Sequence, residues 1–189
     1  MTIPSKFNRW VFIIIGLLLL GLGGFWAFKK FNFNNYIIGQ AVDSFNGVKI
    51  YYNGWVSHDS GRNVSKDGYN LGLKYQCVEF VKRYYYEHLN HKMPNSLGHA
   101  KDFFNCTLKD GAKNVSRNLT QYSNPSKSRP MVDDLVVFSG TTGNPFGHVA
   151  IISKVTDYYI EIVQQNPGSF AKSQINLYMQ KQNGKCRVN

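Results

Sequence analysis

The longest apolar run in the chain extends from Val11 to Phe28 and contains no charged residue. Lys6 and Arg9 precede it, and a pair of lysines follows it directly. A helix needs about 20 residues to cross a hydrocarbon core, and this run lacks the polar face that a soluble surface helix would show. The pattern therefore predicts a transmembrane anchor over residues 11–28, after a short N-terminal tail.

The same run could instead be a signal peptide that is removed. The small residues that a signal peptidase needs are not evident beyond Ala27, whose neighbours Trp26 and Phe28 are bulky, and no cysteine lies nearby for lipid attachment. Aromatic residues at this end of the run are typical of a membrane interface. We therefore expect a retained single-pass anchor. Positive charges flank both ends of the run, and those of the N-terminal tail slightly favour that end inside, which would place the rest of the chain in the periplasm or at the cell surface. The inverted orientation would place it in the cytosol.

Beyond the anchor, a short polar and aromatic linker, residues 29–37, leads into a single predicted domain over residues 38–189. The segment "VKIYY", residues 48–52, is typical of a short strand. Residues 53–70 are rich in Gly, Ser, Asp and Asn and predict a loop.

A helical pattern begins close to Cys77. Apolar side chains recur three and four residues apart, and charged residues occupy the other side; the apolar positions are Phe80, Val81, Tyr84 and Tyr85. This spacing predicts an amphipathic helix that starts near Gln76 and ends before Pro94. A second short helix is predicted over residues 97–104, with Asn95 or Ser96 as its cap.

The second half of the chain is rich in strand-like segments. A polar loop is predicted over residues 110–130, and β-branched and aromatic runs of strand length follow it: "DLVVFSG", "HVAIISKV", "YYIEIVQQN" and "INLYM". Helices followed by strands indicate an α+β fold with an antiparallel sheet.

Composition narrows the range of functions. The chain has 189 residues, enough for one globular domain with a core, and a formal net charge of +11. This charge suits anionic surroundings such as lipid headgroups or cell-wall polymers. The basic residues are scattered and no nucleic-acid-binding motif is present, so we expect no nucleic-acid partner. The sequence does not indicate an oligomeric state.

The three cysteines are Cys77, Cys106 and Cys186, an odd number with no zinc-ligand spacing. If Cys77 is a nucleophile, the other two are the remaining pair that could form a disulfide. The other histidines likewise show no metal-binding spacing; they are His58, His88, His91 and His99. We therefore expect no metal and no cofactor.

Cys77 has two interpretations. At a helix N-terminus, free N–H groups and the helix dipole would stabilise a thiolate and lower the thiol pKa. The alternative is a small apolar residue buried between helix and sheet, which is common for free cysteines. His148 begins an apolar strand after a glycine and could serve as a base, although a histidine at a strand end is often only hydrogen-bonded.

Three segments in this order, "YQCVEFVKR", "DLVVFSGTTGNPFGHVAII" and "YIEIVQQN", resemble the CHAP family of cysteine- and histidine-dependent amidohydrolases and peptidases. Within that family the similarity is greatest to the glutathionylspermidine amidase type, which has a similar aromatic-Gln-Cys-Val-Glu-Phe helix start. The resemblance covers the chain from about Ile38 to near its end. It implies a papain-like fold of the NlpC/P60 kind, in which a helix bearing the cysteine packs on an antiparallel sheet.

The resemblance also implies residue roles. Cys77 would be the nucleophile and His148 the base, and the Cys77 backbone N–H would form the oxyanion hole with help from Gln76. The family has Glu-Gln-Asn where this chain has Gln164, Gln165 and Asn166, so Gln164 stands where a carboxylate is expected.

An amide oxygen at Gln164 can still orient the imidazole, but it stabilises an imidazolium less than a carboxylate does. Asn166 is expected either to help position Gln164 or the histidine loop, or to be a turn residue. Glu161 could replace the missing carboxylate only if a bulge intervenes, because strand alternation puts it on the opposite face from Gln164. The pair Asp133 and Asp134 is not expected to form an acid/base site, since neighbours on a strand face opposite ways.

The sequence thus predicts a membrane-anchored cysteine amidase or peptidase that acts through a thioester, with cell-wall peptides of peptidoglycan as the expected substrate. Two alternatives remain: a γ-glutamyl or glutathionylspermidine-type amidase, and a catalytically degenerate domain that only binds its ligand.

Overall fold

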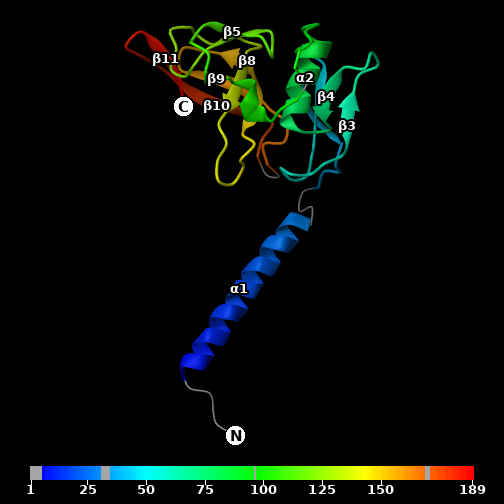
Figure 1. Cartoon of the computed structure of the whole chain (residues 1–189), viewed down its shortest axis with the longest axis vertical. Helices are drawn as coiled ribbons and strands as arrows, with labels where there is room; N and C mark the ends of the chain where they lie inside the picture. Colours follow the sequence, from blue (N-terminus) through cyan, green and yellow to red (C-terminus); the bar gives the residue numbers. More distant parts are fainter. Residues whose placement is uncertain (1–5, 31–34, 96, 169–170) are drawn as a thin grey trace. The chain divides into compact units, whose positions relative to one another are not determined.

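The computed structural model describes residues 6–30, 35–95, 97–168 and 171–189 (Figure 1). The chain divides into two compact units, Met1–Asn35 and Tyr36–Asn189. In chain order the helices and strands are α1 (Lys6–Lys30), β1 (Ala41–Phe45), β2 (Val48–Tyr51), β3 (Arg62–Val64), β4 (Asn70–Leu73), α2 (Cys77–Glu87), the 3₁₀ helix η1 (Ala100–Phe103), β5 (Ala112–Asn114), β6 (Leu119–Gln121), β7 (Leu135–Phe138), β8 (His148–Val155), β9 (Tyr159–Val163), β10 (Gln174–Gln182) and β11 (Lys185–Val188).

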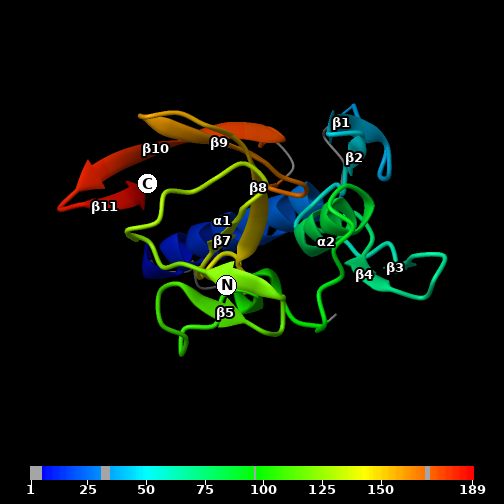
Figure 2. The same cartoon turned by 90° about the horizontal axis from the view of Figure 1, so that it is seen from above.

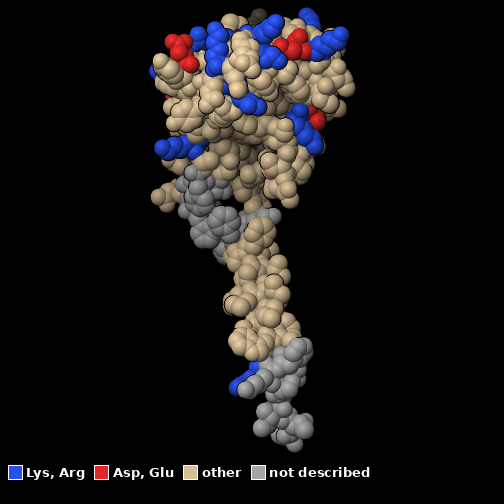
Figure 3. All heavy atoms as spheres, turned by 90° about the vertical axis from the view of Figure 1, so that its left-hand side faces the viewer, with Lys and Arg blue, Asp and Glu red and all other residues tan. Residues whose placement is uncertain are grey.

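Helix α1 contains the apolar run. Its segment Arg9–Ala27 has a mean hydropathy of 2.3, and it is long and apolar enough to cross a membrane, a property that a signal sequence near the N-terminus shares. In Figure 3 the described part of this helix presents a nearly uncharged surface. The helix extends to Lys30, two residues beyond the predicted end of the run. Its retention and its orientation stay predictions.

The second unit is built on one five-stranded antiparallel sheet with the strand order β11-β10-β9-β8-β7. Side chains of β8 alternate between its two faces, as a pleated strand requires. Val149 and Ile151 face a core cluster that includes α2, whereas Ala150 and Ile152 belong to a second cluster on the other face. The four strands expected from the sequence are all present, and the sheet has a fifth, β11.

Helix α2 lies beside β8 in Figures 1 and 2 and buries the face that its periodicity predicted. Phe80, Val81 and Tyr84 are each 0% exposed. Burying side chains of this size contributes about 1.5–3 kcal/mol each, so this face dominates the attachment of the helix to the sheet. The expected second helix is shorter than predicted. It is the single 3₁₀ turn η1, capped by His99, whose backbone N–H donates to the Asp102 carboxylate over 2.7 Å. Of the two expected caps, Asn95 lies outside this turn and Ser96 is not among the described residues.

Three two-stranded hairpins, β1-β2, β3-β4 and β5-β6, surround this core. Two of them correct the sequence analysis, because β3 lies within the predicted loop 53–70 and β5-β6 lies within the predicted loop 110–130. These strands are three residues long and mostly polar, so they carry no period-2 apolar signal. The outcome is a mixed helix and sheet fold in which strands also precede α2.

Candidate active site

Cys77 is the first residue of α2 and is 8% exposed. The turn that delivers it contains Tyr75 at φ 65, in the left-handed region that a non-glycine residue rarely adopts. Gln76 follows in an extended conformation and caps the helix without a side-chain cap bond. Non-glycine residues in such conformations cluster at functional sites, where surrounding structure holds them in place.

The pKa of the Cys77 thiol is raised above its ordinary value, because burial disfavours the thiolate. The backbone N–H groups of Val149, Val78 and Cys77 itself act in the opposite direction but do not outweigh burial. The expected lowering of the thiol pKa by the helix N-terminus is therefore wrong in its net sign. The N–H groups are present, and desolvation is the larger effect.

His148 is the first residue of β8 and follows Gly147, which has φ 72. A Cβ atom at Gly147 would overlap the carbonyl oxygen of Phe138 and crowd Lys101. The turn that leads into His148 therefore requires glycine at this position. Burial lowers the pKa of His148, and its hydrogen bond with Gln164 partly offsets that lowering. Burial therefore favours the neutral form of this imidazole.

The hydrogen bond between His148 and Gln164 joins Nε2 and Oε1 over 2.9 Å. The Gln164 side chain cannot be turned round, because its Nε2 donates to the Lys172 carbonyl over 3.0 Å. Since Oε1 can only accept, His148 Nε2 must carry the proton of the neutral ring. Nδ1 is then left with a lone pair and is the nitrogen that can accept a proton.

The thiol and the imidazole lie at the same end of β8, because the N–H of Val149, the neighbour of His148, faces the Cys77 sulfur. Helix α2 packs against this strand, which brings the two sequence segments together. The hydrogen bonds of the described residues do not include one between Cys77 and His148. Burial thus favours the neutral forms of both the Cys77 thiol and the His148 imidazole.

The Gln76 side chain is held at three points. Its Nε2 donates to the carbonyls of Val56, over 3.2 Å, and His58, over 2.7 Å. Its Oε1 accepts from Asn166 Nδ2 over 2.7 Å, and the same Asn166 nitrogen donates to the Val56 carbonyl over 3.0 Å. Asn166, at φ 56, therefore has a turn conformation, and its side chain positions Gln76.

The other carboxylates are engaged elsewhere. Glu161 accepts a hydrogen bond from Ser153 Oγ over 2.8 Å, and a register shift lies between Ile152 and Lys154 on the neighbouring strand. Asp133 accepts the Tyr84 hydroxyl over 2.5 Å, and burial raises the pKa of Asp134. These contacts support structural roles, as expected for the adjacent aspartates.

Among the described residues, no group of three or more His, Cys, Asp or Glu side chains could hold a metal ion. Cys106 is exposed and Cys186 is half-buried, and both are free thiols.

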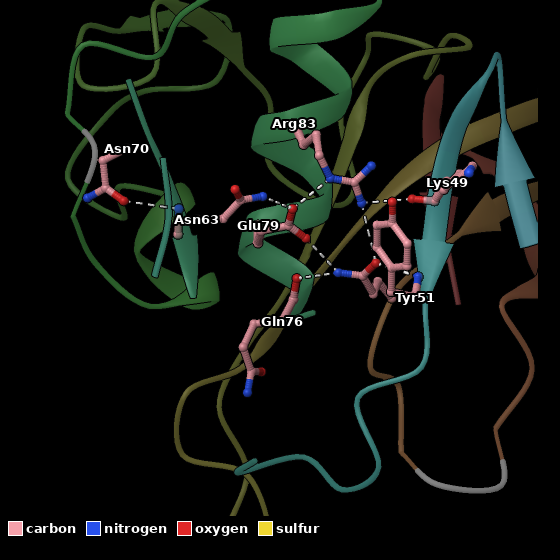
Figure 4. A network of polar contacts seen from close by, with 9 residues as sticks. Lys49, Tyr51, Asn63, Asn70, Gln76, Glu79 and Arg83 are labelled. Carbon is pink, nitrogen blue, oxygen red and sulfur yellow. Dashed lines mark hydrogen bonds and ion pairs between the residues drawn. The ribbon is translucent and has the colours of Figure 1, made fainter. Parts of the chain in front are cut away.

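Figure 4 shows a buried polar network that sequence reasoning missed. Glu79 is 1% exposed and forms a 2.6 Å ion pair with Arg83 Nε, which lies one turn later in α2. Asn63 Nδ2 and Gln165 Nε2 also donate to the Glu79 carboxylate, over 2.8 and 2.9 Å. Such charged residues usually mark a solvated helix face, so only their position beside Cys77 could have hinted at this role.

Comparison with known proteins matches the part of the chain that contains the candidate site residues. The CHAP domain family matches residues 66–166, a range that includes Cys77, His148 and Gln164. A trypanothione synthetase from Crithidia fasciculata is 31% identical over 107 residues, which are 57% of this chain and 16% of that protein. A glutathionylspermidine synthase from the same organism is 34% identical over 106 residues, 52% of this chain and 14% of that protein. The chain thus covers less than a fifth of the length of these curated relatives.

Proposed function

Because the chain belongs to the CHAP domain family, a family of amidase-like hydrolases, we propose that it is a cysteine amidase or peptidase with Cys77 as nucleophile and His148 as base. The observation that carries this proposal is the Gln164–His148 hydrogen bond, whose direction leaves Nδ1 as the proton acceptor. A helix that bears the cysteine and packs on an antiparallel sheet that bears the histidine is the papain-like plan.

In this proposal the Cys77 thiol and the His148 imidazole start in their neutral forms, which determines the order of the reaction steps. His148 Nδ1 takes the thiol proton as the Cys77 sulfur attacks the carbonyl carbon, which gives a tetrahedral intermediate with a negatively charged oxygen. When the intermediate collapses, the C–N bond breaks and the imidazolium gives its proton to the leaving amine. Water then attacks the thioester with His148 as base, and this step releases the carboxylic acid and restores the thiol.

The Cys77 backbone N–H is the first donor to the developing oxyanion in this proposal. Gln76 supplies the second from its Nε2. The longer of its two hydrogen bonds, to the Val56 carbonyl, can be exchanged for the oxyanion because Asn166 still donates to that carbonyl. Asn166 thus keeps the Gln76 amide in the orientation that makes Nε2 available.

Two amide classes are candidates as substrates. Peptide bonds of peptidoglycan fit a membrane-anchored domain outside the cytoplasm and a chain with a net charge of +11. An amide of the glutathionylspermidine type is favoured by the names of the two relatives.

The test is mass spectrometry of products from the detergent-solubilised full chain, incubated in parallel with peptidoglycan and with glutathionylspermidine. Cys77→Ala is the control. We expect amide-cleavage products that depend on Cys77, and the substrate that yields them identifies the class. A folded chain that binds one of these ligands but turns over neither would instead establish a binding-only domain, the alternative that the missing carboxylate at Gln164 favours.

A further inference from the structure

Gln165 is completely buried, although it lies between two residues of the proposed site. Its Oε1 accepts the backbone N–H of Tyr51 over 2.7 Å. Its Nε2 donates to the Gln76 carbonyl over 3.0 Å and to Glu79 Oε2 over 2.9 Å. The orientation of this amide is fixed, because Tyr51 N–H can only donate and the other two partners can only accept.

The contact with the Gln76 carbonyl bears directly on the chemistry. That carbonyl and the Cys77 N–H belong to the same peptide group, and in a planar trans peptide they point in opposite directions. The Phe80 N–H of α2 already donates to this carbonyl over 3.1 Å, and Gln165 Nε2 is a second donor from outside the helix. Two donors that hold the carbonyl on one side aim the N–H on the other side. Hydrogen bonding to the carbonyl also polarises the peptide, which makes its N–H a stronger donor.

The rest of the network holds Gln165 still. Figure 4 shows Glu79 and Arg83 of α2 facing Lys49 and Tyr51 of β2. Arg83 Nη2 donates to the Lys49 carbonyl over 2.7 Å while its Nε pairs with Glu79. The carboxylate that receives Gln165 Nε2 is thus tied to the neighbouring hairpin.

We propose that Gln165 is a positioning residue that aims and polarises the Gln76–Cys77 peptide, so that the Cys77 N–H meets the developing oxyanion. This inference rests on the proposed amidase function. It gives the end of β9 two adjacent tasks: Gln164 orients the base, and Gln165 orients the oxyanion donor. Catalysis then depends on a residue that touches neither substrate nor sulfur.

The test compares Gln165→Leu with Gln121→Leu in the full chain. Gln121, in the β5-β6 region, is a matched control because it is also buried, at 9% exposed. Its side chain makes hydrogen bonds with the backbone of Asn105 and with the side chain of Asn114. We expect kcat to fall about tenfold in Gln165→Leu, a fraction of the roughly 10²–10³ that a whole oxyanion donor contributes, with little change in KM. Alkylation of Cys77 by iodoacetamide creates no oxyanion, so its rate should stay within about twofold of wild type, well short of the kcat loss.

A spectroscopic readout separates this inference from the proposed function. In Gln165→Leu the Gln76 carbonyl ¹³C and the Cys77 amide ¹H resonances should move upfield, and in Gln121→Leu they should not. Unmoved resonances in a folded Gln165→Leu overturn the inference whether or not any substrate is turned over. So does a fall in Cys77 alkylation that matches the fall in kcat, since that would mean general disruption of the site. Absence of wild-type turnover with the resonance shifts intact would count against the amidase alone.

Discussion

At the scale of single residues, we expect Gln164 to govern how readily His148, the proposed base, becomes protonated. A carboxylate at this position would accept a charge-assisted hydrogen bond from the imidazolium, about 1 kcal/mol stronger than the neutral bond. Gln164→Glu should therefore raise the pKa of His148 and increase Cys77 alkylation near neutral pH about fivefold, the factor that such a free energy implies.

The same substitution should lower the melting temperature, because Gln164 Nε2 now satisfies the Lys172 carbonyl and a carboxylate oxygen would repel it. Alkylation rates measured at Cys77 by peptide mass spectrometry distinguish this thiol from Cys106 and Cys186. Gln164→Ala is the control, since it removes the orienting bond without adding charge. An unchanged alkylation profile in Gln164→Glu would show that this position does not govern the imidazole.

The pH dependence of wild-type turnover follows from two shifts with the same physical cause. Burial favours the neutral forms, so it lowers the pKa of His148 below 6.5 and raises that of Cys77 above 9.0. The base is lost when His148 is protonated, so activity should persist at pH 6.5 and fall only below it. Cys77 alkylation should keep rising above pH 9. A kcat/KM profile with its acid limb above pH 6.5 would contradict the neutral pair.

At the scale of elements, Gly72 sets how closely β4 approaches the first turn of α2. Its φ is 125, and a Cβ there would lie 3.3 Å from both the Cα and N atoms of Glu79. These are backbone atoms of a packed helix, so they cannot move aside without shifting the helix. Gly72→Ala should destabilise the fold by about 1–3 kcal/mol through overpacking and backbone strain.

Urea unfolding measures this cost, and Gly61→Ala is the matched control. Gly61 also has a positive φ, 81, but open space lies where its Cβ would be. Gly61→Ala therefore carries the backbone strain without the contact. Equal losses in the two variants would show that the close approach to Glu79 contributes nothing.

The elements differ in how far the sequence could predict them. The helix at Cys77 follows from apolar periodicity, because it buries one regular face. The strands β7 to β10 follow from β-branched and aromatic runs, which supply residues of the two core clusters. Strands β1 and β11 lack such a face, yet each adjoins an Asn-Gly turn with positive φ at both residues, at Asn46-Gly47 and at Asn183-Gly184. That dipeptide is a strong hairpin signal, so these strands were within reach of sequence reasoning.

The candidate site divides in a similar way. Cys77, His148 and Gln164 stand out because motif order and the start of helix or strand single them out, and their catalytic roles stay predictions. The contacts of Gln165 could not be predicted from the sequence. Its partners Tyr51, Gln76 and Glu79 are far from it in sequence, and a glutamine at a strand end looks polar and exposed until the fold buries it.

At the scale of the whole molecule, the two core clusters lie entirely within the unit Tyr36–Asn189. Lys and Arg side chains are spread over the face of this unit seen in Figure 3 rather than gathered in one stripe, so this face offers no concentrated charge for a membrane surface. If the chain is membrane-attached, we expect α1 to be the attachment. We expect a retained α1 to hold the full chain in the membrane pellet after alkaline carbonate extraction, with the intact mass of all 189 residues.

A chain that starts at Tyr36 should then appear in the supernatant, fold with a melting temperature close to that of the full chain, and alkylate Cys77 at the same rate. The reason is that the side chains described in α1, residues 9–27, belong to neither core cluster. If expression of the full chain instead yields a soluble product that lacks the N-terminal segment, the N-terminal helix is a cleaved signal. Failure of the Tyr36–Asn189 unit to fold would show that residues before Tyr36 stabilise it, which the division of the chain into two compact units does not predict.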